Sequence, residues 1–251
     1  MSGRSVADWL LWRLSKLIVL PVLYLYPLRM RRFGVEHVPE HGPVLLVCNH
    51  VSVADPIILM AAARKRRTAM IAKRELFLKH PVFAWILRTY RSIPLDRSKP
   101  ADFTAIRRAV ALLDEGHAVV VFPEGHVSRA GTMRRGAPGA GFFGLRPGVT
   151  VVPAAIWNTQ LFRGPARLRF GPPIDLSDIE APTRHERNRL ATDRVMTAIA
   201  ELLPTVGGPA QAAPVGPQRL IDRTRGIWFP PPGHDPDADA ERGPVAARSP
   251  R

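Results

Sequence analysis

The feature that most constrains the fold is an alternation of short apolar runs with longer helix-like stretches through the middle of the chain. PVLLVC at 43–48 is typical of a buried strand, and the stretch at 54–63 that follows has helical character. Strands that alternate with helices predict an α/β fold with a mostly parallel central sheet flanked by helices. Such sheets bind ligands beyond the carboxyl ends of their strands. We expect strands at 43–48, 68–72, 92–95, 119–122, 149–156 and 167–170, and helices at 54–63, 75–90 with a break near Pro81, 102–115 and 183–203.

The segment before this alternation, residues 1–34, is apolar but too interrupted to cross a bilayer. Its uninterrupted apolar run covers only residues 17–28, after Arg13 and Lys16, whereas a spanning helix needs about 20 residues. The aromatic residues and arginines around the run favour an apolar, membrane-associating helix that lies in the interface. A buried helix of a soluble core is the alternative.

The segment after the alternation, residues 204–251, holds ten of the 26 prolines and few large apolar residues. This composition predicts a largely disordered tail. Within it, the stretch at 219–233 carries a Trp-Phe pair beside arginines and could instead dock on the domain or on a membrane. We therefore expect a membrane-associating segment at 1–34, one folded domain at 35–203 and a tail at 204–251.

The charge of the chain restricts the classes of partner that it is expected to bind. Lys and Arg number 36 against 21 Asp and Glu, and the net charge of +15 favours nucleic acid, an anionic membrane or phosphorylated metabolites. Eleven of the basic residues fall between positions 61 and 100, where only two acidic residues occur. Because the chain has no recognisable nucleic-acid-binding motif, we expect an anionic membrane surface and no nucleic acid. The single cysteine, Cys48, excludes an intramolecular disulfide and suits a reducing compartment.

A histidine directly follows the first predicted strand, and an aspartate lies five residues further on. His50 and Asp55 flank a turn that opens a helix, so the carboxylate can bind the imidazole, set its tautomer and make the ring a general base. Asp55 also precedes Pro56, where an aspartate is a favoured helix cap. A catalytic dyad and a helix cap are both compatible with this spacing.

Two further polar clusters follow predicted strands. FPEGHVSR at 122–129 combines a carboxylate, a glycine that allows close approach of a ligand, a serine and an arginine, which suits a polar or phosphorylated substrate. RSIPLDR at 91–97 ends on Arg97, whose guanidinium can bind a phosphate through two hydrogen bonds. An ordinary polar turn and a solvated arginine are the respective alternatives.

Together, the three clusters resemble the sequence blocks of the glycerolipid acyltransferase family, which includes bacterial 1-acylglycerol-3-phosphate acyltransferases. NHVSVAD at 49–55 is similar to the family's N-H-x4-D block, SIPLDR at 92–97 to its Ile-Pro-x-x-Arg block and FPEGHVS at 122–128 to its F-P-E-G block. VPAAI at 152–156 is a weaker match to a fourth block. Since the resemblance spans roughly residues 35–203, we expect this segment to be an acyltransferase domain.

The resemblance implies transfer of a fatty acyl group from acyl-CoA or acyl-carrier protein to the hydroxyl of lysophosphatidate or a related lysophospholipid, in phospholipid biosynthesis, without a cofactor or metal. It implies that His50 is the general base and that Asp55 orients it. It also implies a peripheral or monotopic enzyme at the cytoplasmic face of the cell membrane. The residues assigned to substrate binding are Asn49, Arg97, Glu124, Gly125, Ser128 and Arg129.

Departures from the family pattern bear on the acceptor. Arg91 stands where the family commonly has glycine, and His126 and Val127 stand where it has Thr-Arg; Arg129 could replace the missing guanidinium. The identity of the acceptor is thus less defined than the reaction. A non-catalytic lipid- or polyanion-binding module of the same fold and an acyl-CoA thioesterase are the alternative functions.

Two other motifs carry weaker hypotheses. GAGFFG at 139–144 matches G-x-G-x-x-G, but no predicted strand leads into it and no acidic residue lies about 20 positions on, so a dinucleotide site is not expected. Cys48 shares a strand face with His50 and could act as a nucleophile, although a lone cysteine in an apolar strand is usually a core residue. The remaining histidines show no ligand spacing, and we predict no metal site.

Overall fold

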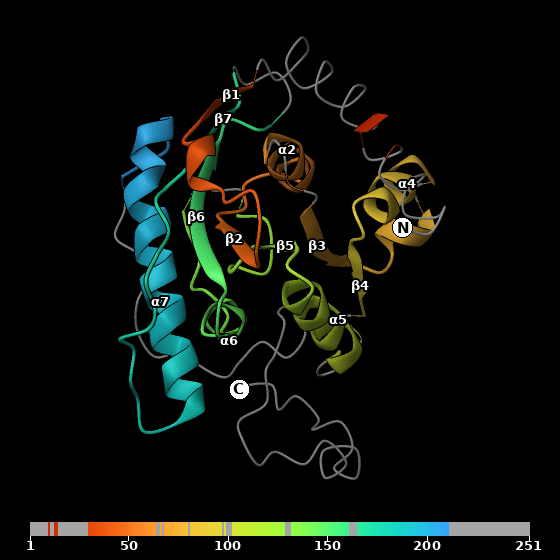
Figure 1. Cartoon of the computed structure of the whole chain (residues 1–251). Helices are drawn as coiled ribbons and strands as arrows, with labels where there is room; N and C mark the ends of the chain where they lie inside the picture. Colours follow the sequence, from red (N-terminus) through yellow and green to blue (C-terminus); the bar gives the residue numbers. More distant parts are fainter. Residues whose placement is uncertain are drawn as a thin grey trace, which may run out of the picture.

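The computed structural model describes residues 10, 13–14, 30–63, 66, 68–79, 81–96, 98, 102–128, 132–160 and 165–210. Its centre is a seven-stranded sheet in the order β1-β7-β6-β2-β5-β3-β4 (Figure 1). Neighbouring strands run parallel except for β6 and β7, which are antiparallel, so the predicted mostly parallel sheet is confirmed. The strands are β1 (Arg31–Phe33), β2 (Val44–Cys48), β3 (Thr68–Lys73), β4 (Ile93–Leu95), β5 (Ala118–Val121), β6 (Thr150–Trp157) and β7 (Arg167–Phe170).

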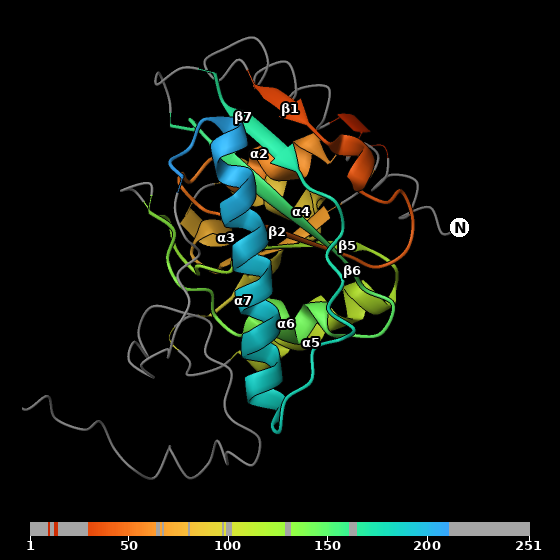
Figure 2. The ribbon, with the colours of Figure 1, turned by 90° about the vertical axis from the view of Figure 1, so that its left-hand side faces the viewer.

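Helices cover both faces of the sheet (Figure 1, Figure 2). One face packs against α2 and the end of α4, and the opposite face packs against α5, α6 and α7. Each face therefore has its own apolar core. The helices are α2 (Asp55–Ala62), α3 (Leu76–Lys79), α4 (Pro81–Thr89), α5 (Phe103–Asp114), α6 (Gly139–Gly144) and α7 (Arg184–Leu202), with the 3-10 turns η1 (Val35–His37) and η2 (Leu203–Val206).

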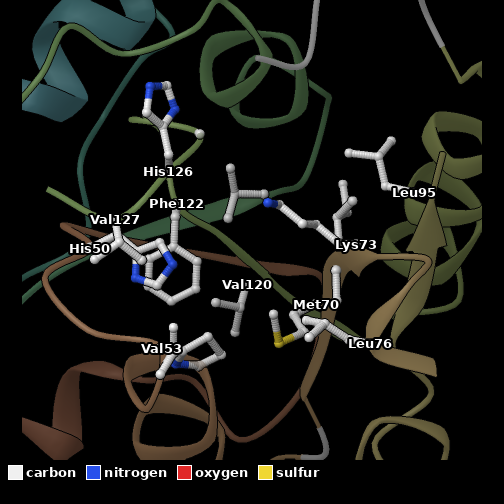
Figure 3. A pocket seen from close by; sticks show the side chains of 15 residues that line it. His50, Val53, Met70, Lys73, Leu76, Leu95, Val120, Phe122, His126 and Val127 are labelled. Atoms are coloured by element: carbon white, nitrogen blue, oxygen red, sulfur yellow. The ribbon is translucent and has the colours of Figure 1, made fainter. Parts of the chain in front are cut away.

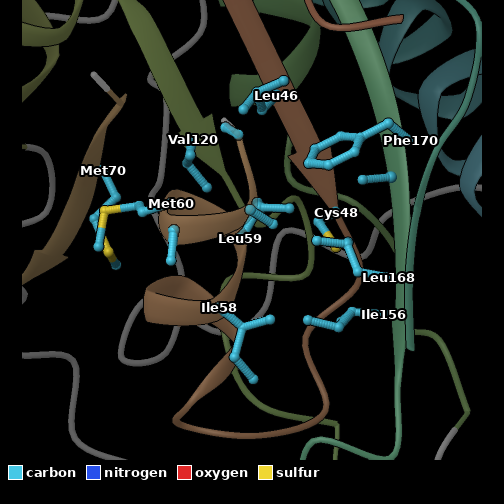
Figure 4. Close-up of a cluster of buried hydrophobic side chains, with 14 of the residues drawn as sticks. Leu46, Cys48, Ile58, Leu59, Met60, Met70, Val120, Ile156, Leu168 and Phe170 are labelled. Atoms are coloured by element: carbon cyan, nitrogen blue, oxygen red, sulfur yellow. The ribbon is translucent and has the colours of Figure 1, made fainter. Parts of the chain in front are cut away.

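Strand β2 lies between the two cores, and all five of its residues are buried. Leu46 and Cys48 belong to the core under α2, together with Phe170 of β7 (Figure 4). Leu45 and Val47 belong to the core under α5, α6 and α7. Because side chains alternate across a strand, a run that is apolar at every position fits only a strand covered on both faces. This position places the residues that follow β2 at the centre of the sheet's carboxyl edge.

The observed elements lie within one residue of most expected bounds. The expected break in the helical stretch at 75–90 is confirmed, since α3 ends at Lys79 and Pro81 begins α4. Asp102 caps α5, since its carboxylate accepts hydrogen bonds from the backbone N–H groups of Thr104 and Ala105 at 3.1 Å each. Strand β1 was missed because it is a three-residue edge strand with two arginines, which lacks the apolar pattern of a buried strand.

Most of the expected N-terminal membrane-associating helix lies outside the described residues. Within it, Leu10, Arg13 and Leu14 are helical and exposed. In the described part of the chain, every helix is too short or too polar to span a membrane. Strand β1 occupies positions 31–33 of the same segment and pairs with β7.

The other end of the folded part is η2, which follows α7 and buries Leu203 and Val206 in the core under α5, α6 and α7. Most of the predicted disordered tail, 211–251, including the stretch at 219–233, lies outside the described residues. The domain boundaries between residues 34 and 35 and between residues 203 and 204 stay predictions. Strand β1 precedes the first boundary and η2 extends past the second, so the folded part is slightly longer than 35–203.

Candidate active site

A pocket lies at the carboxyl ends of β2, β5, β3 and β4 (Figure 3), the edge at which α/β sheets bind ligands. Its volume is about 260 Å³, and most of its wall is apolar. Three of the lining residues have polar side chains, namely His50, Lys73 and His126. This lining suits an apolar ligand that carries a few polar groups. The apolar wall is formed chiefly by Val53, Met70, Leu76, Leu95, Val120 and Phe122.

His50 lies just after β2, in the pocket wall. Its Nδ1 atom is 2.9 Å from Oδ2 of Asp55, the first residue of α2. The Asp55 side chain is fully buried and the His50 side chain is 14% exposed, so the pair is shielded while the ring stays reachable. A carboxylate at Nδ1 favours the tautomer with its proton there, which leaves the lone pair on Nε2 to accept a substrate proton. The structure thus brings the predicted pair together in a geometry suited to general base catalysis.

The carboxylate of Asp55 is held by four hydrogen bonds. Besides the imidazole, its Oδ2 atom accepts from the backbone N–H groups of Val51 at 2.6 Å and Ser52 at 2.7 Å. Its Oδ1 atom accepts from the hydroxyl of Thr159. The alternative that Asp55 caps α2 is wrong, because Ala54 is the N-cap residue and the carboxylate binds the preceding turn. Sequence reasoning missed Thr159, which lies 104 residues away and outside the recognised blocks.

The face of the His50 ring is covered by Phe122, the first residue after β5. The two ring centroids are 4.3 Å apart and the planes meet at 27°. Stacking of this kind restricts the tilt of the imidazole, while the Asp55 bond restricts its rotation. Both the tilt and the rotation of the imidazole ring are therefore restricted.

Glu124 is a buried connector between the two loops that carry the site. Its Oε1 atom accepts from the backbone N–H of His50 at 2.9 Å, and its Oε2 atom accepts from the hydroxyl of Ser128 and the backbone N–H of Arg134 at 2.8 Å. Burial raises the pKa of the Glu124 carboxyl above its usual value, and these hydrogen bonds only partly offset that effect. Glu124 thus fixes the position of the His50 backbone relative to the loop after β5.

Ser128 and Gly125 complete the loop after β5. The Ser128 backbone N–H donates to the carbonyl of His50 at 2.6 Å, and its side chain is buried against Glu124. Gly125 adopts a φ of 73°, which favours glycine, and it lies in the pocket wall. Of the two, Gly125 is the residue placed to contact a ligand, whereas Ser128 binds the protein itself.

Asn49 joins β2 to its neighbour β6. Its side-chain amide donates to the carbonyl of Ile156 at 3.0 Å, and its side-chain oxygen accepts from the Ile156 N–H at 2.8 Å. The side chain is buried and does not line the pocket. The geometry therefore gives Asn49 a positioning role, where the sequence predicted contact with substrate.

Arg97 and Arg129, both predicted to bind substrate, lie outside the described residues. Lys73, at the end of β3, and His126, in the loop after β5, also line the pocket. The sequence marks His126 only as a departure from the family pattern, and not as a pocket residue. Lys73 was visible only as one member of the basic stretch at 61–100, which does not distinguish it from its neighbours. Among the described residues, no three His, Cys, Asp or Glu side chains gather as a metal site would require.

The two weaker motifs have structural explanations. Burial, and secondarily the charges of Asp55 and Glu124, raise the pKa of the Cys48 thiol well above its usual value, so the thiol stays protonated and unreactive near neutral pH. The glycines at 139–144 form α6, which packs tightly against α7. A Cβ atom would meet the Asn188 backbone of α7 at Gly141, and the side chains of Leu176 and Val151 at Gly144, so packing accounts for these two glycines of the match.

Comparison with known proteins agrees with this geometry. The family described as Acyltransferase matches residues 29–157, just over half of the chain, and the match includes His50, Asp55 and Glu124. The chain belongs to this acyltransferase family. Human 1-acyl-sn-glycerol-3-phosphate acyltransferase alpha is 30% identical over 172 residues, which make up 67% of this chain and 58% of the human protein. The matched part of this acyltransferase family member thus covers less than two thirds of the length of the human protein.

A shorter relative and a solved structure extend the comparison. The 1-acyl-sn-glycerol-3-phosphate acyltransferase of Bacillus subtilis (strain 168) is 28% identical over 176 residues, which are 68% of this chain and 86% of that protein. The crystal structure of the 1-acyl-sn-glycerophosphate (LPA) acyltransferase PlsC from Thermotoga maritima matches with a TM-score of 0.59 at 23% identity, covering 80% of this chain and 84% of that chain. The likeness to PlsC supports the fold of this acyltransferase family member.

Proposed function

We propose that the protein transfers a fatty acyl group from a thioester donor, acyl-CoA or acyl-carrier protein, to the hydroxyl of lysophosphatidate or a related lysophospholipid. The observation that carries the proposal is the His50–Asp55 pair, oriented at 2.9 Å in the wall of an apolar pocket. The relatives named 1-acyl-sn-glycerol-3-phosphate acyltransferases support the choice of acceptor.

The chemistry follows from the tautomer of His50. Nε2 accepts the proton of the acceptor hydroxyl as its oxygen attacks the thioester carbonyl carbon, and Asp55 stabilises the imidazolium that forms. Collapse of the tetrahedral intermediate breaks the carbon–sulfur bond. The imidazolium then returns its proton to the departing thiolate, which leaves an ester, a free thiol and neutral His50. No metal takes part in this sequence of steps.

The pocket offers suitable surroundings for both parts of such an acceptor. Apolar side chains such as Met70, Val120 and Leu76 can hold a hydrocarbon chain. Lys73, in the same wall, is a cation for the acceptor phosphate. Arg97 and Arg129 stay in the proposal as further phosphate ligands, on the strength of the sequence blocks alone.

We further propose that the protein acts at an anionic membrane surface, the cytoplasmic face of the cell membrane. Val53 in the pocket wall is 74% exposed and Leu78 of α3 is 71% exposed, and Trp85 of α4 is also exposed. Arg74 and Arg88 are exposed on the same connection between β3 and β4. Exposed apolar side chains flanked by cations suit contact with anionic lipid.

The experiment offers palmitoyl-CoA with lysophosphatidate and measures product mass and free thiol. We expect wild-type turnover that needs the acceptor, and a fall of about a thousandfold in kcat for His50→Ala. His185→Ala, which removes an imidazole from α7, is the matched control and should keep wild-type turnover. Near-normal turnover by His50→Ala would overturn the mechanism.

The same measurement separates the alternative functions. A thioesterase would release thiol at the same rate without lysophosphatidate. A non-catalytic binding module would release none with any acceptor. Repeating the assay with a panel of lysophospholipids then identifies the preferred acceptor by product mass.

A further inference from the structure

We propose that Thr159 is a positioning residue of the His50–Asp55 dyad, and that its hydroxyl sets the orientation in which Asp55 holds the imidazole. The inference rests on the proposed function, since it concerns the same dyad. Thr159 lies beyond the family match at 29–157 and outside all four recognised sequence blocks.

The contact itself is fully enclosed. Thr159 and Asp55 are both completely buried, and the Thr159 hydroxyl donates to Oδ1 of Asp55. The other oxygen, Oδ2, takes the imidazole of His50 and two backbone N–H groups. Thr159 is thus the donor that the described residues provide to Oδ1. Without it, one oxygen of a buried carboxylate would lose its partner, which is costly and allows the carboxylate to turn.

The backbone around Thr159 is built to aim the hydroxyl. Strand β6 ends at Trp157, and Asn158 adopts a φ of 55°, a left-handed conformation that asparagine tolerates better than most residues. This turn directs the chain from the end of β6 toward the start of α2.

Two flanking hydrogen-bonded links hold the same two loops together. On one side, Asn49 binds both backbone groups of Ile156, at 3.0 and 2.8 Å. On the other side, the Gln160 side chain donates to the carbonyl of Val51 at 3.4 Å. The Thr159 contact lies between these links, so the loop after β6 supports the loop that carries His50. The placement of Thr159 is therefore constrained from both directions along the chain.

A purely structural threonine would behave differently from a positioning one. If the hydroxyl only stabilises the fold, its removal lowers the free energy of unfolding without changing the turnover of the folded enzyme. If it orients the dyad, removal lowers kcat while both KM values hold, because Thr159 is placed to contact Asp55 and does not line the pocket.

The experiment compares Thr159→Val, Thr159→Ser and Thr192→Val in the full-length chain. We expect Thr159→Val to lower kcat by about a hundredfold with KM values within about twofold of wild type, and Thr159→Ser to restore most of the activity. Thr192→Val is the matched control. Thr192 of α7 is also buried and hydrogen-bonded, to Asn188 and Gly141 at 2.9 Å each, so this variant should lose stability and keep kcat.

A second readout does not depend on turnover. In proton NMR, the Nδ1–H signal of His50, assigned by its absence in His50→Ala, should be present in wild type and Thr159→Ser and be lost or shifted in Thr159→Val. An unchanged signal in Thr159→Val, or a wild-type kcat, would overturn the inference. If the wild type transferred no acyl group, the proposed function would fail, and the NMR comparison would still decide whether Thr159 orients the ring.

Discussion

At the scale of single residues, two buried carboxylates hold His50 from different sides. Asp55 binds the ring, whereas Glu124 binds the backbone N–H at 2.9 Å. A sequence block that places a glutamate after a strand does not distinguish a ligand for substrate from a connector within the protein. Only the contacts assign Glu124 to the second class, since its two oxygens accept from His50, Ser128 and Arg134.

Glu124→Gln tests the raised pKa of this carboxyl. Well below the ordinary value of 4.5, the carboxyl is neutral in both the folded and the unfolded chain. As pH rises, the unfolded chain ionises first, so the free energy of unfolding of the wild type falls relative to Glu124→Gln until the folded carboxyl ionises too. Each unit between the two pKa values contributes about 1.4 kcal/mol. Urea unfolding of both proteins from about pH 4 upward measures the difference, and a relative gain in wild-type stability would contradict it.

At the scale of elements, the packing of α6 explains two of the glycines in the G-x-G-x-x-G stretch, Gly141 and Gly144. A Cβ atom at Gly141 would lie 2.0 Å from the backbone oxygen of Asn188 in α7. At Gly144 a Cβ atom would meet the tip of the Leu176 side chain at 2.9 Å. The backbone of Asn188 cannot move aside as the tip of the Leu176 side chain can. An added side chain should therefore be tolerated less well at Gly141 than at Gly144.

Gly141→Ala should therefore destabilise the protein by about 1–3 kcal/mol through overpacking, although alanine normally stabilises a helix interior. Gly144→Ala is the control in the same helix and should cost less, because Leu176 can shift. Thermal and urea unfolding of the two variants compare these effects. Equal stabilities, or a more stable Gly141→Ala, would show that α6 and α7 can separate freely.

At the scale of the whole molecule, exposed apolar side chains and exposed arginines occur together on the connection between β3 and β4. Leu78 and Trp85 are exposed on α3 and α4, and α3 also supplies Leu76 to the pocket wall. Figure 1 shows α4 at one end of the sheet and α7 beside β6 at the other. A membrane bound through α3 and α4 would thus lie close to the pocket and away from α7.

Leu78→Asp tests this orientation. Loss of an apolar contact and a new negative charge should weaken binding to phosphatidylglycerol vesicles by about tenfold. Leu190→Asp makes the same exchange at an exposed leucine of α7 and should bind as wild type does. Vesicle co-sedimentation of the full-length chain at low and high salt measures both. Equal losses in the two variants would mean that α3 does not face the membrane.

The sequence by itself determined where most strands and helices lie along the chain, and it predicted the pairing of His50 with Asp55. Both depend on local patterns: the apolar periodicity of each element, and a turn that brings residues five apart into contact. Strand β1 was not predicted, because a charged strand of three residues at the edge of the sheet has no apolar periodicity. The membrane-associating helix and the disordered tail stay predictions from composition.

Only the tertiary structure decided which distant residues support the dyad. Thr159 lies 104 residues from Asp55, Ile156 lies 107 from Asn49, and Glu124 lies 74 from His50. These contacts exist because β6 and β5 are the two neighbours of β2 in the sheet, so that their carboxyl ends meet the His50 loop from both sides. Strand order is a property of the packed sheet, and no local pattern in the chain specifies it.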